Sequence, residues 1–366
     1  MSSDAGPSVR RLLERAIRAG MAPGMVAGWQ SLDEADPRFV AVGHASLRPV
    51  VEKMTDGRWF DLASLTKPLV ITPLVLLTVR TAGLSLESRV AHVIPELGGE
   101  PLGDRRIRHL LTHTSGLPAW EPIYARARTP SAEDVLRALA ELPVGKVRGE
   151  VVYSCPGFIL LGLILERLAD TSLDALMSRH VLEPLGLTNE IGFRPAPENS
   201  PVAGTESPGT EQLLMGERDL DPAMIPRSSP GLPDDGNSRF LGGVAGNAGL
   251  FGTIRGVLGL ARAIVDPGAL LTDAEISVAI RNHTPGLEQA RGLGWQLASS
   301  PGCSAGSALT PTAFGHTGFT GTSLWIDPTR NLAMALLANR THPGHRPTDL
   351  HPLRRRFHQL VVEATT

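Results

Sequence analysis

The chain has 366 residues, and 42% of them are hydrophobic, which is enough for a substantial core in one large domain or two closely packed ones. A net charge of −2 provides no basic footprint for nucleic acid. Two cysteines without a C-x-x-C pair argue against a disulfide framework, and the longest apolar stretches are too short to span a bilayer. We therefore expect neither a nucleic-acid nor a membrane partner.

The N-terminal part of the chain begins without the apolar segment of a secretory signal, so the expected location is cytoplasmic. Apolar residues at helical spacing from Val9 to Ile17 predict an amphipathic helix, which Gly20 ends. Strand-like runs follow at residues 25–30 and 38–42.

The stretch Phe60-Asp61-Leu62-Ala63-Ser64-Leu65-Thr66-Lys67-Pro68 has a serine three positions before a lysine at a predicted helix start. Residues three apart share a helix face, so the Lys67 amine can reach the Ser64 hydroxyl and take its proton. The free N–H groups and the positive end of the helix favour an alkoxide-like oxygen. The pair alone also has an ordinary interpretation, in which Ser64 is an N-cap and Lys67 is a solvated surface residue.

The middle of the chain, from about residue 81 to 291, alternates helical patterns with long loops rich in proline and glycine. Tyr153-Ser154-Cys155 precedes an apolar run that we expect to start a helix at Pro156 and to be its buried centre. Tyr153 would then face a cleft, although a core tyrosine with a satisfied hydroxyl is the commoner arrangement. Segment 194–239 is predicted to be a long loop of the kind that often borders a site.

A second serine motif competes with the first. Gly302-Cys303-Ser304-Ala305-Gly306 matches the G-x-S-x-G nucleophile elbow, and Asp327 and several histidines follow in the appropriate order. An elbow must join a strand to a helix, whereas this one lies in a loop of small residues between two prolines. Ser304 is therefore the weaker candidate. His109 and His113 are four apart, but no glutamate follows the first, so we expect no metal.

The last third of the chain begins with Phe314-Gly315-His316-Thr317-Gly318-Phe319, ahead of strand-like runs at 323–327 and 332–338 and a final helix over 353–361. Strands near both ends would pair in one sheet, which the two terminal helices would cover. We predict a discontinuous sheet domain, 1–80 and 292–366, and an inserted, mainly helical domain, 81–291.

The Ser64–Lys67 pair, Tyr153-Ser154-Cys155 and His316-Thr317-Gly318 together resemble the S-x-x-K, Y-x-N and K-T-G motifs of the serine β-lactamase and penicillin-binding-protein superfamily, in particular its class C β-lactamase and esterase branch. Stretches 107–118, 241–251 and 292–295 also resemble that branch. The resemblance implies a serine hydrolase of α/β class with a β-lactamase/transpeptidase-like fold. In that fold an antiparallel sheet is flanked by the N- and C-terminal helices and carries an inserted α-helical domain.

The resemblance also implies roles for residues. Ser64 would be the nucleophile of an acyl-enzyme that water or an alcohol resolves. Lys67 and Tyr153 would share the role of general base, and we expect burial and a neighbouring cation to lower the pKa of Lys67. The backbone N–H groups of Ser64 and Phe319 would form the oxyanion hole.

Four residues are expected to bind substrate: Cys155, His316, Thr317 and Gly318, the last by allowing close approach to the backbone. Cys155 stands where the family usually has an asparagine that donates to the substrate's acylamino carbonyl, and a thiol is a weak donor. His316 replaces a lysine and removes a fixed positive charge. Both departures favour esters, so we expect a carboxylesterase or acyltransferase on small esters, with a small-molecule ester or amide substrate and no cofactor.

Two alternatives remain open. One is a β-lactamase or D-alanyl-D-alanine carboxypeptidase. The other belongs to a different class, a catalytically weak binding or sensor protein in which Cys155 marks decay of the site. The natural substrate, the acyl acceptor and the oligomeric state are not specified by the sequence.

Overall fold

The computed structural model describes residues 4–147, 149–196, 198, 200–205, 216, 221–229, 231–344 and 348–365. The predicted long loop 194–239 lies partly outside the described residues. Its described parts include a short 3₁₀ turn, Pro222–Met224, and helix α11, Gly236–Phe240.

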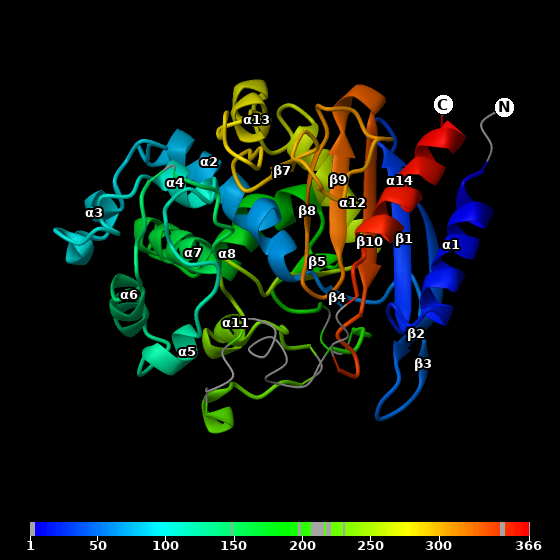
Figure 1. Ribbon diagram of the computed structural model, residues 1–366, viewed down its shortest axis with the longest axis horizontal. Coiled ribbons are helices and arrows are strands. Elements are labelled where there is room, and N and C mark those ends of the chain that lie inside the picture. Colours follow the sequence, from blue (N-terminus) through cyan, green and yellow to red (C-terminus); the bar gives the residue numbers. More distant parts are fainter. Residues whose placement is uncertain are drawn as a thin grey trace.

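A seven-stranded antiparallel sheet is the centre of the fold (Figure 1). In spatial order its strands are β3 (Glu52–Lys53), β2 (Arg38–Ser46), β1 (Gly24–Ser31), β10 (Leu332–Ala338), β9 (Ser323–Asp327), β8 (Phe314–Thr317) and β7 (Gln296–Leu297). The central pair joins the two ends of the chain, with Met25 opposite Ala338. The predicted α/β fold with an antiparallel sheet is confirmed.

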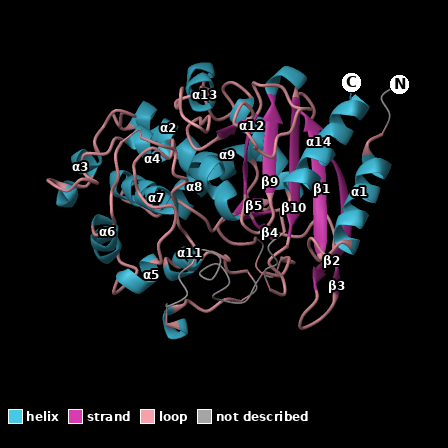
Figure 2. Ribbon diagram, in the orientation of Figure 1, coloured by secondary structure: helices cyan, strands magenta, loops and turns pink. Residues whose placement is uncertain are grey.

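Helices cover both faces of the sheet (Figure 2). The amphipathic helices α1 (Gly6–Arg18) and α14 (His351–Thr365) bury Val9, Leu13 and Phe357 in one cluster with sheet residues such as Trp325. Helix α12 (Ile254–Val265) packs on β1 and β10, so closely that a Cβ at Gly28 would lie 2.5 Å from Ile254 Cγ1. The two terminal helices were expected, whereas α12 was not assigned to the sheet from sequence.

The remaining helices form the other half of the molecule, to the left in Figure 1. They are α2 (Thr72–Thr81), α3 (Val90–Val93), α4 (Ile107–Leu111), α5 (Ile123–Arg126), α6 (Ala132–Ala140), α7 (Cys155–Ala169), α8 (Leu173–Met177), α9 (Glu183–Leu185) and α13 (Asp273–Ile280). The proposed domain limits stay a prediction. Helix α12 falls inside the range 81–291 that was assigned to the helical domain, and it nevertheless packs on the sheet.

Helix α7 is the buried axis of this helical half. Apart from half-buried Leu163, the run from Phe158 to Leu165 is buried, as the all-round apolar sequence predicted. The helix begins where the Ser154 hydroxyl accepts a hydrogen bond from the Gly157 N–H at 3.3 Å. This cap places Tyr153 and Cys155 at the mouth of the helical half, next to the sheet.

A small three-stranded sheet leads directly into the predicted nucleophile. Its order is β4 (Phe60–Asp61), β6 (Phe251–Gly252) and β5 (Ile191–Gly192). Strand β4 therefore fixes the chain immediately before Ser64. One helical run, 63–81, is long and apolar enough to cross a membrane by length and composition alone, and 72% of its most apolar window is buried inside the protein, as a core helix would be.

Candidate active site

The turn that carries Ser64 is not a regular α-helix. Ala63–Leu65 forms a 3₁₀ turn, and Lys67–Ile71 forms a π-helical turn before α2 begins. Pro68 has no N–H, so the Ser64 carbonyl cannot accept the i+4 hydrogen bond of an α-helix. Ala63 has a left-handed φ of 48°, which is uncommon for a residue with a side chain. The predicted helix start is thus a tighter turn that presents Ser64.

Lys67 is fully buried, and its ammonium group reaches Ser64 as the three-residue spacing predicted. Lys67 Nζ lies 3.0 Å from Ser64 Oγ and 2.8 Å from the carbonyl oxygen of Asn247. It also lies 3.5 Å from Cys155 Sγ. The structure therefore places Cys155 beside the expected base, as well as on the substrate side where the sequence placed it.

The protonation of Lys67 differs from the expectation. Burial lowers the pKa of Lys67, but the electrostatic influence of the neighbouring Cys155 and Tyr153 opposes this effect, and the net pKa is raised above the ordinary value. The expected fall in the pKa of Lys67 is thus wrong for the resting site. Lys67 is an ammonium there and must release a proton before it can accept one.

Tyr153 is held in place by His113, a residue to which the sequence assigned no role. The Val152 N–H donates to the His113 carbonyl, and the Ser154 N–H donates to His113 Nδ1, both at 2.9 Å. The rings of His113 and Tyr153 lie 4.6 Å apart. Burial lowers the pKa of His113 well below its ordinary value, so the ring is neutral and can accept. His113 thereby brackets Tyr153 on both sides along the chain.

The Tyr153 ring lies over the base, with Lys67 Nζ 4.9 Å from its centroid. Burial raises the pKa of the Tyr153 hydroxyl more than contacts with Lys67 and Ser64 lower it. Among the described residues the hydroxyl makes no hydrogen bond of good geometry. Catalytic hydrogen bonds are often loose before substrate binds, so this arrangement is compatible with a proton shuttle.

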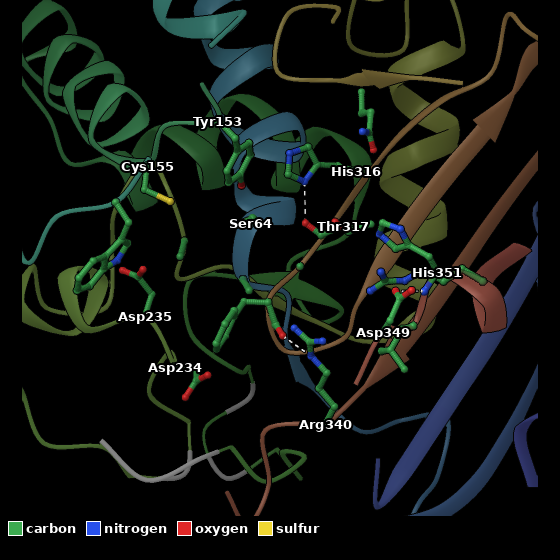
Figure 3. Close-up of a pocket in the computed structure, with 18 of the residues that line it drawn as sticks. Ser64, Tyr153, Cys155, Asp234, Asp235, His316, Thr317, Arg340, Asp349 and His351 are labelled. Atoms are coloured by element: carbon green, nitrogen blue, oxygen red, sulfur yellow. Dashed lines mark hydrogen bonds between the residues drawn. The ribbon is translucent and has the colours of Figure 1, made fainter. Parts of the chain in front are cut away.

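Strand β8 supplies the opposite wall, as predicted, and Figure 3 shows His316 next to Tyr153. His316 Nδ1 lies 2.8 Å from the Thr317 carbonyl, and burial lowers the pKa of His316 well below its ordinary value. Position 316 is therefore uncharged. At Gly318 a Cβ would lie 2.1 Å from Thr322 Oγ1 and 2.7 Å from the Leu62 carbonyl oxygen, so glycine is required there by the close approach of this strand end to the nucleophile segment.

A cavity of about 370 Å³ opens between these walls. It is lined by Ala63, Ser64, Trp120, Tyr153, Cys155, Asp234, Asp235, Ala248, Arg291, Gln296, His316, Thr317, Gly318, Phe319, Arg340, Thr348, Asp349, Leu350, His351 and Arg354. Apart from Lys67, which is buried behind Ser64, every residue predicted for the site lines this cavity. The three sequence motifs meet in one place.

The cavity also contains positive charge that the sequence did not predict. Arg291 is 6% exposed, and its guanidinium lies 5.8 Å from the centroid of the Tyr153 ring. Burial lowers the pKa of Arg291 to about 10, which leaves it cationic at neutral pH. The predicted loss of charge at residue 316 agrees with the neutral His316, whereas Arg291 brings a positive charge to the cavity from another position. The sequence contained a hint of this role, since Arg291 directly precedes the stretch 292–295 that resembles the family.

Ser304 lies elsewhere. It is 0% exposed, and its hydroxyl accepts a hydrogen bond from Trp325 Nε1 at 3.0 Å. It is not among the described residues that line the cavity. The structure therefore provides Ser304 with a packing partner in the interior and places Ser64 at the cavity.

Comparisons with known proteins agree with this geometry. A provisionally named D-alanyl-D-alanine carboxypeptidase of Escherichia coli (strain K12) is 28% identical over 320 residues, which cover 79% of this chain and 71% of the relative. The solved structure of EstCE1, described as a hydrolase with promiscuous acyltransferase activity, has a TM-score of 0.73 at 22% identity and covers 97% of this chain and 98% of its own. A class C β-lactamase from Rhodobacter sphaeroides has a TM-score of 0.72 at 18% identity, with 97% of this chain and 99% of its own covered. These last two likenesses concern the fold.

The β-lactamase family model matches residues 13–359, and that range contains all three motifs that meet at the cavity. The chain therefore belongs to the β-lactamase family and has the β-lactamase/transpeptidase fold of serine hydrolases.

Proposed function

We propose that this protein hydrolyses or transfers the acyl group of small esters through an acyl-enzyme on Ser64. The observation that carries the proposal is the contact of 3.0 Å between Lys67 Nζ and Ser64 Oγ, with the Tyr153 ring over the same amine. A serine hydroxyl needs a partner of this kind to become a nucleophile. The names of the relatives support hydrolase chemistry in the family, without deciding the substrate.

The proton path follows from the charges of the resting site. Lys67 and Tyr153 both have raised pKa values, so the pair is fully protonated and becomes a base by losing one proton. The pair then takes the Ser64 proton as Oγ attacks the ester carbonyl, and returns it to the leaving alkoxide. The N–H groups of Ser64 and Phe319 would receive the developing oxyanion, an interaction typically worth about 3–4 kcal/mol per donor. In deacylation, water or an alcohol attacks the acyl carbonyl and gives its proton to the same pair, and Ser64 Oγ leaves and recovers a proton.

The preference for esters rests on two residues. Cys155 Sγ lies against Lys67, so the side chain at this position serves the base and offers at most a weak donor to a substrate amide. His316 is neutral and buried, and its Nδ1 is directed to the Thr317 carbonyl. Neither side chain supplies the strong donor that an acylamino or carboxylate group would need at these two positions.

The experiment is a substrate panel with the wild-type protein and Ser64→Ala. It contains short-chain p-nitrophenyl esters, nitrocefin and a D-alanyl-D-alanine peptide, and labelling by a fluorophosphonate reports the nucleophile independently. We expect ester turnover and labelling that both depend on Ser64. Nitrocefin turnover as fast as that of the best ester would contradict the ester preference. Absence of labelling and of turnover would favour the binding or sensor alternative.

A D-alanyl-D-alanine carboxypeptidase is the second candidate, and a specific observation favours it. The buried cation of Arg291 in the cavity is suited to a substrate carboxylate such as a peptide C-terminus. Arg291→Met should then abolish peptide cleavage and leave neutral esters nearly unaffected. An equal loss on both substrates would assign Arg291 to packing against Tyr153. A cytoplasmic location likewise stays a prediction.

A further inference from the structure

The two loops that carry the predicted oxyanion donors are joined through residues 61 and 62. The Thr320 hydroxyl donates to the Asp61 carbonyl at 2.7 Å, and the Thr322 hydroxyl donates to the Leu62 carbonyl at 3.1 Å. Both threonines belong to the turn that follows β8 and contains Phe319. These two hydrogen bonds therefore fix the position of the Phe319 loop relative to residues 61 and 62, just before Ser64.

The Asp61 side chain fixes the other half of the same site. Its carboxylate accepts the Ala63 N–H at 2.8 Å and the Asp234 N–H at 2.6 Å. The first contact holds Ala63, which has a left-handed φ of 48°. The conformation of Ala63 determines the direction of the next N–H group, that of Ser64. The second contact ties the same turn to the segment before α11, which lines the cavity.

The Phe319 loop is held from its far side as well. Arg340 Nε donates to the Phe319 carbonyl at 2.8 Å, a contact drawn as a dashed line in Figure 3. Arg354 Nη2 donates to the carbonyls of Gly321 and Thr322 at 3.0 Å. The loop is thus clamped between two arginines and the 61–62 backbone, and Asp61 is the member of this network that also reaches the nucleophile turn.

We propose that Asp61 is a positioning residue of the oxyanion site: its carboxylate sets the Ser64 turn, and its carbonyl holds the loop of Phe319, so that both backbone donors are aligned together. This inference rests on the proposed acyl-enzyme function of Ser64. It assigns no contact with substrate to Asp61 itself.

The energetics indicate that Asp61 does not serve stability alone. Asp61 is 3% exposed, and burial raises its pKa to about 6, although the N–H groups of Asp234 and Ala63 lower it. Of the charged groups that face Asp61, Asp235 raises this pKa and Arg239 lowers it. Because the folded-state pKa is raised, the contribution of this group to stability is largest at low pH and declines as the pH rises from about 4 to 6. The folded protein is therefore less stable with Asp61 ionised than with Asp61 protonated. The ionised form, which accepts both N–H groups, is nevertheless the one present at neutral pH.

The experiment compares Asp61→Asn with Asp327→Asn. Asparagine at 61 keeps one acceptor oxygen and turns an NH₂ group toward the second N–H, so one of the two contacts is lost. Asp327 is the matched control, because it is also fully buried and accepts two backbone N–H groups, from Thr310 at 2.8 Å and Arg330 at 3.2 Å, at the opposite end of β9. Ester kcat, KM and Tm are measured for both, with kcat recorded from pH 4.5 to 8.

We expect Asp61→Asn to lower kcat by about 10- to 10²-fold with little change in KM, since loss of a whole oxyanion donor costs about 10²–10³-fold. In the wild-type protein, protonation of Asp61 should add a further fall in kcat below about pH 6 to the fall caused by protonation of the Lys67–Tyr153 pair, and this further fall should be absent in the variant. Asp327→Asn should lower Tm and leave kcat and its pH profile unchanged. Equal effects of both variants on kcat, or an unchanged acid limb in Asp61→Asn, would overturn the inference.

Thr320→Val keeps the test decisive if Asp61→Asn does not fold. It removes only the hydroxyl that donates to the Asp61 carbonyl, and we expect a fall in kcat of about 10-fold with KM preserved. An unchanged kcat in folded Thr320→Val would also overturn the inference. Failure of the proposed function has a different signature: the wild-type protein itself would then show neither ester turnover nor fluorophosphonate labelling of Ser64.

Discussion

Two serines in this chain satisfy recognised nucleophile patterns, and their surroundings differ completely. Ser64 lines a cavity and lies 3.0 Å from a buried lysine amine. Ser304 is enclosed, and its hydroxyl accepts from the indole of Trp325. A hydroxyl that accepts from a neutral N–H gains no basic partner, so it is not activated. The comparison shows that a short pattern acquires chemical meaning only from the groups that the fold brings to it.

The candidate partners of Ser304 are also engaged elsewhere. The Asp327 carboxylate accepts from the backbone of Thr310 and Arg330. Of the histidines proposed with it, His342 accepts from the Leu47 N–H at Nε2 at 2.8 Å, and its Nδ1 lies 3.2 Å from the Thr205 carbonyl. His358, which was not a candidate, packs near Trp325 from α14, with Nδ1 2.9 Å from the Ala305 carbonyl. The second motif therefore describes a well-packed junction between the sheet and α14.

The largest expected effect tests the comparison directly. Ser64→Ala should lower ester kcat by roughly 10³-fold or more, since it removes the proposed nucleophile of the acyl-enzyme. Ser304→Ala should keep most of the activity. Steady-state kinetics on one p-nitrophenyl ester, with circular dichroism to verify folding, decide the matter. Inactive Ser304→Ala together with active Ser64→Ala would reverse the assignment.

The next effect concerns the proton shuttle proposed for the Ser64 site. Tyr153→Phe retains the ring that packs against His113 and removes the hydroxyl. General acid–base groups contribute typically about 10²–10⁴-fold, so kcat should fall by that amount with a smaller change in KM. Lys67→Ala should be at least as damaging. Near-normal kcat in Tyr153→Phe would reduce Tyr153 to a structural residue.

The pH dependence of the Ser64 site follows from the raised pKa of Lys67. Because the resting ammonium must lose a proton, kcat/KM should increase as the pH rises above neutral. Cys155→Ala removes the neighbour that raises this pKa most, so the profile should move to lower pH. A pH–rate profile of both proteins checks the sign. A shift toward higher pH in Cys155→Ala would contradict the charge assignment.

A smaller effect is expected on specificity. Cys155→Asn supplies an amide with two N–H donors, and one hydrogen bond regained is worth about 0.5–1.5 kcal/mol, or roughly 2- to 12-fold in turnover of acylamino substrates. Relative rates on nitrocefin and an ester measure this gain. Unchanged selectivity in the folded variant would show that residue 155 acts on the base alone.

The smallest effect on activity belongs to Ser304. Ser304→Ala leaves the buried Trp325 N–H without its acceptor, which should lower the free energy of unfolding by about 1–3 kcal/mol while kcat is preserved. Urea unfolding followed by tryptophan fluorescence provides the measurement. An equally stable variant would mean that the indole finds another acceptor.

Much of this arrangement could be predicted from local patterns. Strands β9 and β10 coincide with the runs predicted at 323–327 and 332–338, and the three motifs meet at one cavity. These features depend on residues close together in sequence or on a spacing that a helix fixes. The family likeness then relates the motifs to one another.

The features that were missed depend on contacts between distant segments. The bracket that His113 forms around Tyr153, the charge of Arg291 near the same ring, and the raised pKa of Lys67 are all of this kind. The pKa of a buried lysine is a balance between desolvation and partner charges, and single-sequence reasoning supplies only the first. The packing of α12 on the sheet was missed for the same reason, because its apolar pattern does not reveal its partner.

The pairing of β1 with β10 has a consequence for synthesis on the ribosome. Strand β1 emerges early but cannot be flanked by β10 until residue 338 has been translated, roughly 15–60 s later at about 5–20 residues per second. During that interval an apolar strand is open on one edge and is exposed to aggregation. Nascent chains arrested before β10 should therefore bind chaperones and resist fluorophosphonate, whereas chains released after it should react.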